Sequence, residues 1–245
     1  MTALPQPIAL AEERPFSGTY TVPEAALYLR ATTPPPGVPL SLWRRKREQF
    51  VAPSSRHLHA WVKRGLAAGE APKQAARRRT VTFEDLIRLR LIAIMRSRGV
   101  PLPAILRAEE FARSVTGSPQ PFITEPLWTC STNVFISTAN LLIAASQGGQ
   151  LGLDFLREYM QPVNHGLDFT ADGRASTWRP AEGVLVAGNI AFGAPCIEGT
   201  RIQTEIVWEM HQAGDSAPRL AALYGVSEAA IDKALAWEGT LARAT

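Results

Sequence analysis

The sequence predicts a mainly α-helical chain with short β-strands, an α+β protein, from three observations. Capped segments with helical periodicity occupy most of residues 19–118. Shorter, strand-like runs fill residues 119–180, and three short amphipathic helices follow within residues 181–245. Residues 1–18 are proline-rich and aperiodic, which is typical of a flexible tail. We therefore expect a tail and three folded parts with these boundaries.

A capped helix is expected to open the first folded part. Thr21 can cap its first turn, Pro23 fits that turn, and Glu24 favours the positive end of the helix. The apolar residues of this segment share one helical face: Val22, Ala25, Ala26 and Leu29. Residues 32–39 are rich in proline and predict a loop, and residues 41–49 fit a short basic helix.

A second capped helix is expected over residues 56–64, after Pro53-Ser54-Ser55 and before Gly65. Leu58, Trp61 and Val62 form its apolar face, so its basic and histidine side chains are expected to point largely outward. Residues 69–79 form a polar, basic loop that leads into a strand at 80–83. The order of helix, loop and strand is typical of a winged helix-turn-helix domain.

A long helix is expected over residues 84–98, and a further helix from Pro101 to about Thr116. The apolar stripe of the long helix contains Ile87, Leu91, Ile94 and Met95. This stripe serves either the interface of a homodimer or the core of the domain itself, and the sequence leaves both interpretations open.

Residues 119–180 form a small mixed α/β middle segment. Residues 121–129 and 133–138 are expected to be short strands, and residues 151–160 a helix. The dipeptide Asp172-Gly173 lies between two strand-like runs, which predicts a hairpin.

The last part begins with strand-like runs at 184–187 and 190–192. Its first helix is defined by Ile202, Ile206, Val207 and Met210. Ser216 and Ser227 are placed to cap the second and third helices. A tight turn at Gly225-Val226 joins those two helices, which is the helix-turn-helix layout.

The two halves of the chain carry opposite charge. Residues 1–120 hold 19 Lys/Arg and 9 Asp/Glu, a net charge of +10, whereas residues 121–245 hold 7 and 13, a net charge of −6. The basic excess is concentrated between Arg44 and Arg79, with eleven basic and two acidic residues. Such a field attracts a polyanion, because neutralised phosphates release counterions.

The basic segment therefore supplies candidate DNA-binding residues. In a winged helix-turn-helix protein the second helix enters the major groove, and the basic wing lies on phosphates. The competing interpretation is a solvated basic surface on an ordinary helical domain. The candidates are Arg44, Arg45, Arg47, Arg56, His57, His59, Lys63, Arg64, Arg77, Arg78 and Arg79.

A second candidate site is the glycine-rich run from Gly193 to Arg201. It lacks the Lys-Ser/Thr of a phosphate-binding P-loop, so a structural turn is favoured for its glycines. Arg201 is a lone cation in the acidic half. It either pairs with Glu198 or Glu205 or contacts a partner, and both alternatives stay open.

Signals for catalysis are weak, and we expect neither an enzyme nor a metal or cofactor. His57 and His59 diverge on a helix because they are two residues apart. Cys130 and Cys196 fit no metal spacing and are expected to be reduced core thiols of a cytoplasmic protein. No apolar run approaches the roughly 20 residues that a membrane span requires.

The C-terminal part resembles a known family over residues 183–240. The resemblance is carried by Phe192-Gly193-Ala-Pro195-Cys-Ile-Glu-Gly199-Thr200-Arg201-Ile202, by Leu220-Ala-Ala-Leu-Tyr224-Gly-Val226-Ser227 and by Ile231-Asp232-Lys-Ala234-Leu235. These residues look like the homeodomain-like module known as domain of unknown function 433. That family is regarded as a VapB-type antitoxin module, found beside genes for PIN-domain ribonucleases.

The N-terminal part is similar to MerR-like winged helix-turn-helix domains. The similarity is carried by Tyr20-Thr-Val-Pro-Glu24-Ala25-Ala26-Leu-Tyr-Leu29 and by Leu58-His-Ala-Trp61-Val62-Lys-Arg-Gly65-Leu66. Residues 31–53 separate the two helices here, whereas the family has a short turn.

Together, the two resemblances imply a long VapB-type antitoxin. It would bind a PIN-domain (VapC-like) endoribonuclease toxin and, as an autorepressor, its operator DNA. The toxin-binding candidates on the turn are Glu198, Thr200 and Arg201. The alternative is a MerR-like transcriptional regulator that senses a small molecule.

Overall fold

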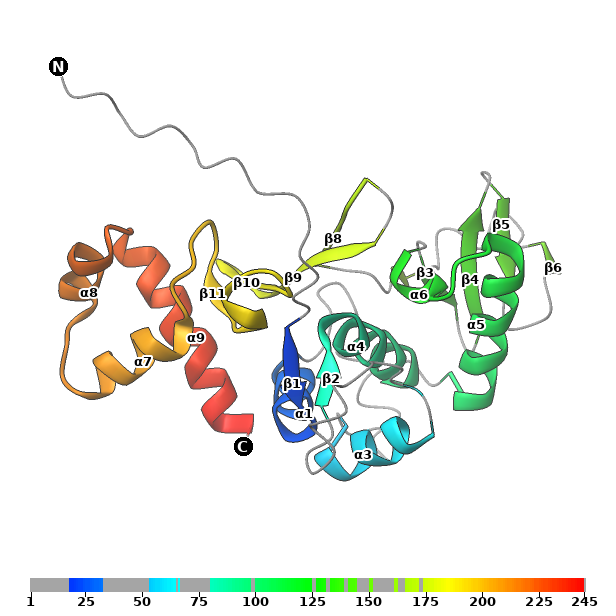
Figure 1. Ribbon diagram of the computed structural model, residues 1–245, viewed down its shortest axis with the longest axis horizontal. Coiled ribbons are helices and arrows are strands. Elements are labelled where there is room, and N and C mark those ends of the chain that lie inside the picture. Colours follow the sequence, from blue (N-terminus) through cyan, green and yellow to red (C-terminus); the bar gives the residue numbers. More distant parts are fainter. Residues whose placement is uncertain are drawn as a thin grey trace, which may run out of the picture.

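The computed structural model confirms the α+β fold, with eight α-helices in its described part and three antiparallel sheets. Figure 1 shows the N-terminal elements between the C-terminal helices on one side and a five-stranded sheet on the other. The structure describes residues 18–32, 53–64, 66, 80–97, 100–124, 127–130, 133–138, 141–144, 150–151, 161–162, 166–171 and 174–244.

Several predictions from the sequence fall outside these residues. They include the tail up to residue 17, the basic helix at 41–49 and nearly all of the helix expected at 151–160. Six candidate DNA-binding residues also lie outside: Arg44, Arg45, Arg47, Arg77, Arg78 and Arg79.

The first helix forms as the sequence predicts. Strand β1 (Thr19–Thr21) pairs with β2 (Thr80–Thr82) and leads into α1 (Val22–Ala31). Thr21 Oγ1 accepts a hydrogen bond from the Glu24 amide, and a Glu24 carboxylate oxygen accepts one from the Thr21 amide, both at 3.3 Å. This reciprocal pair is a capping box, which satisfies two amides at the helix start.

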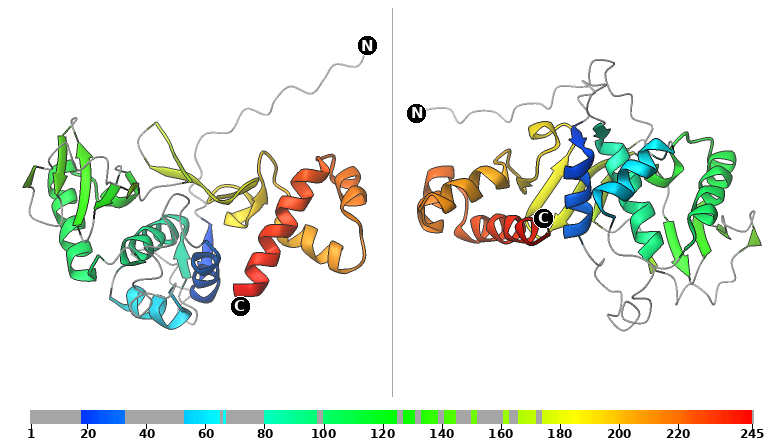
Figure 2. Two further views of the ribbon diagram at one scale, coloured as in Figure 1. Left: turned by 180° about the vertical axis from the view of Figure 1, so that it is seen from behind. Right: turned by 90° about the horizontal axis from the view of Figure 1, so that it is seen from below.

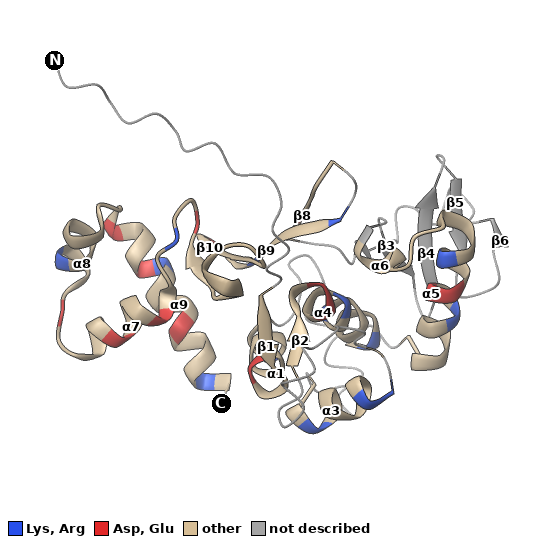
Figure 3. Ribbon diagram, viewed as in Figure 1, with Lys and Arg blue, Asp and Glu red and all other residues tan. Residues whose placement is uncertain are grey.

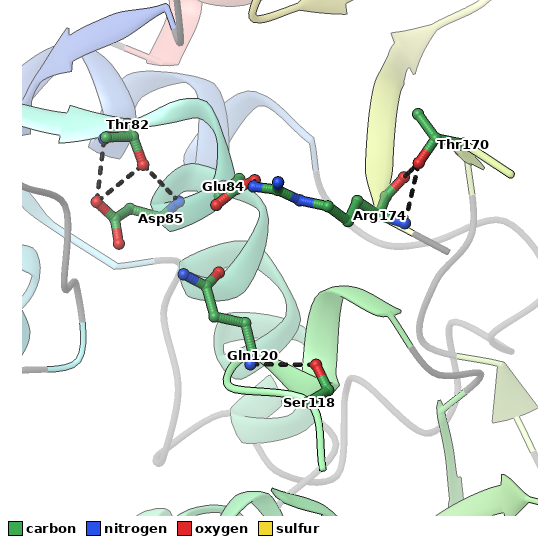
Figure 4. A network of polar contacts seen from close by, with 7 residues as sticks. All are labelled: Thr82, Glu84, Asp85, Ser118, Gln120, Thr170 and Arg174. Carbon is green, nitrogen blue, oxygen red and sulfur yellow. Dashed lines mark hydrogen bonds and ion pairs between the residues drawn. The ribbon is translucent and has the colours of Figure 1, made fainter. Parts of the chain in front are cut away.

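The long helix α4 (Phe83–Ser97) is buried on all sides from Leu86 to Met95. Its start is fixed by Asp85, which accepts hydrogen bonds from the amide and hydroxyl of Thr82 at 3.1 and 3.0 Å (Figure 4). Beside this cap, Arg174 forms an ion pair with Glu84. The apolar stripe of α4 therefore lies in the core of this chain, which was one of its two expected roles.

The next helix, α5 (Leu102–Thr116), also forms where expected and ends at Gly117, whose φ of +70° suits a left-handed C-cap. A short helix, α6 (Pro121–Thr124), follows. The strand expected at 121–129 is therefore wrong in its first half, because proline opens a helical turn there.

The middle sheet has the strand order β6-β5-β4-β3-β7. All of its strand pairs are antiparallel. The strand expected at 133–138 is confirmed. The five strands are β3 (Leu127–Cys130), β4 (Asn133–Thr138), β5 (Leu141–Ala144), β6 (Gln150–Leu151) and β7 (Gln161–Pro162).

A second sheet precedes the C-terminal helices, with the order β11-β10-β9-β8. Its strands β8 (Leu167–Phe169) and β9 (Ala175–Ala181) form the expected antiparallel hairpin. Strand β10 (Val184–Ala187) is fully buried and pairs with β11 (Cys196–Ile197). The strand expected at 190–192 is wrong, because a 3-10 turn, η4 (Ala191–Gly193), occupies this place.

Three helices complete the chain: α7 (Thr204–Gln212), α8 (Ala217–Tyr224) and α9 (Glu228–Ala244). They enclose a small core that contains Ile197, Val207, Leu220 and Ile231. Gly225 ends α8 with a φ of +67°. Ser216 holds the N-cap position of α8 without a side-chain hydrogen bond, whereas Ser227 Oγ accepts one from the Ala230 amide at 3.2 Å.

The larger core joins the N-terminal and C-terminal parts. Trp237 and Leu241 of α9 belong to the same buried cluster as α1 and α4. Figure 2 shows α1 beside α9, where the rings of Tyr28 and Trp237 lie 6.3 Å apart. The Tyr20 hydroxyl donates a 2.9 Å hydrogen bond to the Gly193 carbonyl. This core is continuous across Pro180, where the sequence predicts a domain boundary.

Candidate functional site

The first candidate surface is the outer face of α3 (Ser55–Lys63). Ser54 caps this helix by accepting a hydrogen bond from the His57 amide at 3.4 Å. Leu58 and Trp61 are 0% and 7% exposed and hold the helix on the core. The opposite face exposes five cationic or titratable side chains and no carboxylate: Arg56, His57, His59, Lys63 and Arg64.

Figure 3 shows the Lys and Arg positions of α3 at one margin of the molecule, away from the acidic positions of α7 and α9. Guanidinium and ammonium groups bind phosphates, and Arg and His can also contact base edges. In the His57 ring, Nδ1 lies 3.0 Å from Ser54 Oγ, which leaves Nε2 as the ring nitrogen that could contact a base or a phosphate. The face has the chemistry that a nucleic-acid surface needs.

A buried ion pair supports α3 from behind. Arg88 of α4 donates two hydrogen bonds to the Glu109 carboxylate of α5, both at 2.7 Å. Its third bond, 2.6 Å long, goes to the carbonyl of Leu66, just beyond the end of α3. One guanidinium therefore links α4, α5 and the residue that follows the C-terminal end of α3. This link fixes the position of the basic helix on the core.

The second candidate surface is the turn after β11. The Thr200 amide donates to the Ile197 carbonyl at 3.0 Å, and Gly199 has a φ of +79°. The Thr200 hydroxyl donates to the same carbonyl at 2.8 Å and accepts from the Ile202 amide at 3.0 Å. Gly199 and Thr200 thus serve the turn itself, as the structural interpretation of this motif expects.

Glu198 on this turn is held by an arginine that the sequence did not single out. Arg179 Nε lies 2.6 Å from a Glu198 carboxylate oxygen, and the same guanidinium pairs with Asp168. The Thr177 hydroxyl donates to Asp168 at 2.7 Å. The hydrogen bond from Thr177, and then Arg179, lowers the pKa of Asp168, while Glu198 and Asp168 raise the pKa of Arg179.

Arg201 remains exposed on the turn and makes no hydrogen bond or ion pair within the described part of the chain. The other cations between residues 166 and 244 are engaged. Lys233 pairs with Glu182 at 2.8 Å, and Arg219 pairs with Asp215 at 3.2 Å. Arg243 donates to Thr240 at 3.1 Å. The structure therefore shows neither of the two expected ion pairs of Arg201, with Glu198 or with Glu205, and its contact with a partner stays a prediction.

The carboxylates around α7 and α9 divide into exposed and buried groups. Glu228 and Asp232 are exposed in the first turns of α9, whereas its last turn exposes Arg243. Glu238 is buried and accepts a hydrogen bond from Thr204. Burial, and then the neighbouring Glu205, raises the pKa of Glu238. Burial also raises the pKa of the Cys196 thiol, which is a free cysteine of the core, as expected.

One further feature had no signal in the sequence. Ala191 and Phe192 have φ values of 44° and 58°, and no other non-glycine residue in the described ranges has positive φ. Phe192 is 83% exposed. The turn is held by the contact between Tyr20 and Gly193, which joins residues 173 positions apart.

The part of the chain that the structure covers forms neither a metal centre nor a membrane-spanning helix. No three His, Cys, Asp or Glu side chains come together there in a way that could hold a metal ion. None of its helices combines the length and the hydropathy that crossing a membrane requires.

Residues 186–237 match the sequence profile of a family described as "Protein of unknown function (DUF433)". This match confirms the C-terminal resemblance and covers the end of β10 through most of α9. A crystal structure of Rv2018 from Mycobacterium tuberculosis has a similar fold, with a TM-score of 0.54 and 17% identity over 88% of this chain and 96% of that chain. No curated protein matches the chain.

Proposed function

We propose that this chain is the antitoxin of a type II toxin–antitoxin system. It binds and neutralises a PIN-domain (VapC-like) endoribonuclease, and as an autorepressor it binds its own operator DNA. The observation that carries the proposal is the separation of two unlike surfaces on one molecule. The face of α3 is cationic, whereas the part that resembles domain of unknown function 433 is acidic and exposes one unpaired cation, Arg201.

The proposed binding of operator DNA is supported by the exposed face of α3 and by the Arg88 contacts that fix this helix. A polyanion is attracted to a helix face with five cationic or titratable groups and no carboxylate. The acidic C-terminal helices repel the same polyanion. The MerR-like resemblance gives α3 the place of the helix that enters the major groove.

The toxin half is supported by Arg201 and by the chemistry of the partner class. PIN-domain nucleases act through a cluster of carboxylates that holds divalent metal. A planar guanidinium suits bidentate contact with a carboxylate. Arg201 is exposed on a turn whose backbone is already fixed by backbone and Thr200 hydrogen bonds. Binding of such a cluster would therefore cost little backbone conformational entropy.

Co-expression of the full chain with the PIN-domain nuclease of an adjacent reading frame tests this proposal. We expect a stable complex in which cleavage of RNA is suppressed. Arg201→Ala should weaken the complex by about 2 kcal/mol or more, as hot-spot arginines do. Its thermal midpoint should match that of the parent, because the side chain makes no polar contact within the described residues.

Arg219→Ala is the matched control, since it removes one exposed arginine from the same part of the chain. Its pair with Asp215 spans four residues of one surface, so we expect a change of less than about 1 kcal/mol in the complex. If Arg201→Ala retains the nuclease as tightly as Arg219→Ala does, the toxin contact is wrongly placed. If the parent chain leaves the nuclease active, the proposed function is wrong.

A further inference from the structure

Arg201 and Glu198 lie on the same tight turn, yet they do not pair. The turn is closed by a 2.9 Å hydrogen bond from the Ile197 amide to the Ile202 carbonyl, which brings its two arms together. Opposite charges on the two arms of such a turn attract each other. The structure instead gives Glu198 to Arg179, which lies 19 residues earlier in the chain.

The order of the sheet explains why Arg179 reaches Glu198. Arg179 lies on β9, Asp168 on β8 and Glu198 directly after β11, in a sheet with the order β11-β10-β9-β8. The Arg179 amide donates to the Gly166 carbonyl at 2.8 Å, which fixes its backbone. From the middle of the sheet, one guanidinium therefore bridges a carboxylate on each side.

We infer that Arg179 is a positioning residue: it holds Glu198 and thereby keeps the Arg201 guanidinium free for a carboxylate of the nuclease partner. This inference rests on the proposed function and adds to it the ion pair that keeps Arg201 available for the nuclease. Arg179 itself does not touch the partner. Without it, Glu198 loses its cation and turns to Arg201 across the turn.

The effect on Arg201 is measurable without any partner. Phenylglyoxal reacts with arginine side chains, and a carboxylate paired with the guanidinium slows that reaction. We would treat the full chain with phenylglyoxal and quantify modification of Arg201 by peptide mass spectrometry. Arg179→Met should slow modification of Arg201 about two- to fivefold, the range that an exposed ion pair produces.

Two further variants separate positioning from a structural role. Adding Glu198→Gln to Arg179→Met should restore the parent rate, because the released carboxylate is gone. Arg174→Met breaks a different exposed ion pair, with Glu84, and should leave the rate unchanged. An unchanged rate in Arg179→Met, or a double variant as slow as the single one, would overturn the inference.

Binding of the PIN-domain nuclease by the same variants gives the second readout. Arg179→Met should weaken the complex about two- to fivefold, and the double variant should regain parent affinity. If the rates behave as expected and Arg201→Ala still binds the nuclease fully, the proposed toxin contact fails while the charge arrangement stands. If Arg201→Ala weakens the complex and Arg179→Met does not, the role of Arg179 is wrong.

Discussion

Helices α3 and α9 hold comparable places in their two parts, and their surfaces are opposite. In a helix-turn-helix the second helix of the pair reads DNA, and the sequence predicts this place for α3 after α1 and for α9 after α8. The exposed face of α3 carries Arg56, Lys63 and Arg64, whereas the first turns of α9, which follow the tight turn after α8, expose Glu228 and Asp232. A shared helical layout therefore says little about the partner, and the charge of the exposed face says more.

The inner faces of the two helices differ as well. Leu58 and Trp61 of α3 belong to the large core alone. Helix α9 packs Ile231 and Ala234 into the small C-terminal core and Trp237 and Leu241 into the large one. Helix α9 therefore packs in both cores and holds the two parts together. Helix α3 lies at the margin of the molecule (Figure 3).

The largest expected effect is a difference in unfolding free energy between two variants, one at the buried ion pair behind α3 and one at the exposed ion pair beside the Arg201 turn. Glu109→Ala leaves the Arg88 guanidinium, whose side chain is 10% exposed, without its carboxylate. Loss of one partner of a buried pair costs about 3–5 kcal/mol of unfolding free energy. Glu198→Ala breaks an exposed pair with Arg179 and should cost less than about 1 kcal/mol. Urea unfolding measures both, and equal losses would contradict the contrast.

The junction between the parts can be probed with two glycines of similar backbone conformation. Gly193 and Gly199 have φ values of +89° and +79°, so alanine should cost about 1–2 kcal/mol at either from backbone strain. At Gly193 the new methyl also collides with the Tyr20 hydroxyl, and overpacking adds about 1–3 kcal/mol. At Gly199 nothing lies within 4 Å.

Thermal unfolding of Gly193→Ala and Gly199→Ala therefore isolates the contact between β1 and η4. A lower midpoint for the first variant is the expected result. The same midpoint in both variants would contradict the close packing of Tyr20 against Gly193.

DNA binding should distinguish the two surfaces by charge. The double variant Arg56→Ala/Lys63→Ala should weaken binding to the DNA upstream of the gene and reduce the slope of log affinity against log salt by about 2. A matched double variant that removes the C-terminal cations Arg219 and Arg243 should leave the slope unchanged. A salt titration of band shifts measures both, and an equal fall in slope would refute the assignment of α3.

The smallest expected effect is a pH dependence carried by Glu238 at the base of α9. Its pKa is raised above the ordinary 4.5, chiefly by burial. The folded state therefore binds the proton more tightly than the unfolded state does, and stability falls as pH rises from about 4.5 through the raised pKa. Glu238→Gln should flatten this part of the stability curve in urea unfolding at several pH values. A curve parallel to that of the parent would exclude the role of Glu238.

The local elements could be predicted from the sequence because their signals act over three or four residues. The Thr21–Glu24 capping box, the Ser54 cap and the left-handed stop at Gly225 are of this kind. The errors arose where two local signals competed. Pro121 begins a helical turn rather than a strand, and Phe192 occupies a left-handed turn that no propensity of phenylalanine favours.

By itself, the sequence determined the described helices other than α6, the hairpin between β8 and β9 and the charge difference between the two halves. Only the tertiary structure decided which side chains meet. Arg179 holds Glu198 from 19 residues away, Arg88 holds Glu109 from 21, and Tyr20 reaches Gly193 from 173. Such pairings depend on the order of strands and on the packing of helices, because local propensity carries no information about partners distant in the chain. Arg201 owes its freedom to one of these pairings.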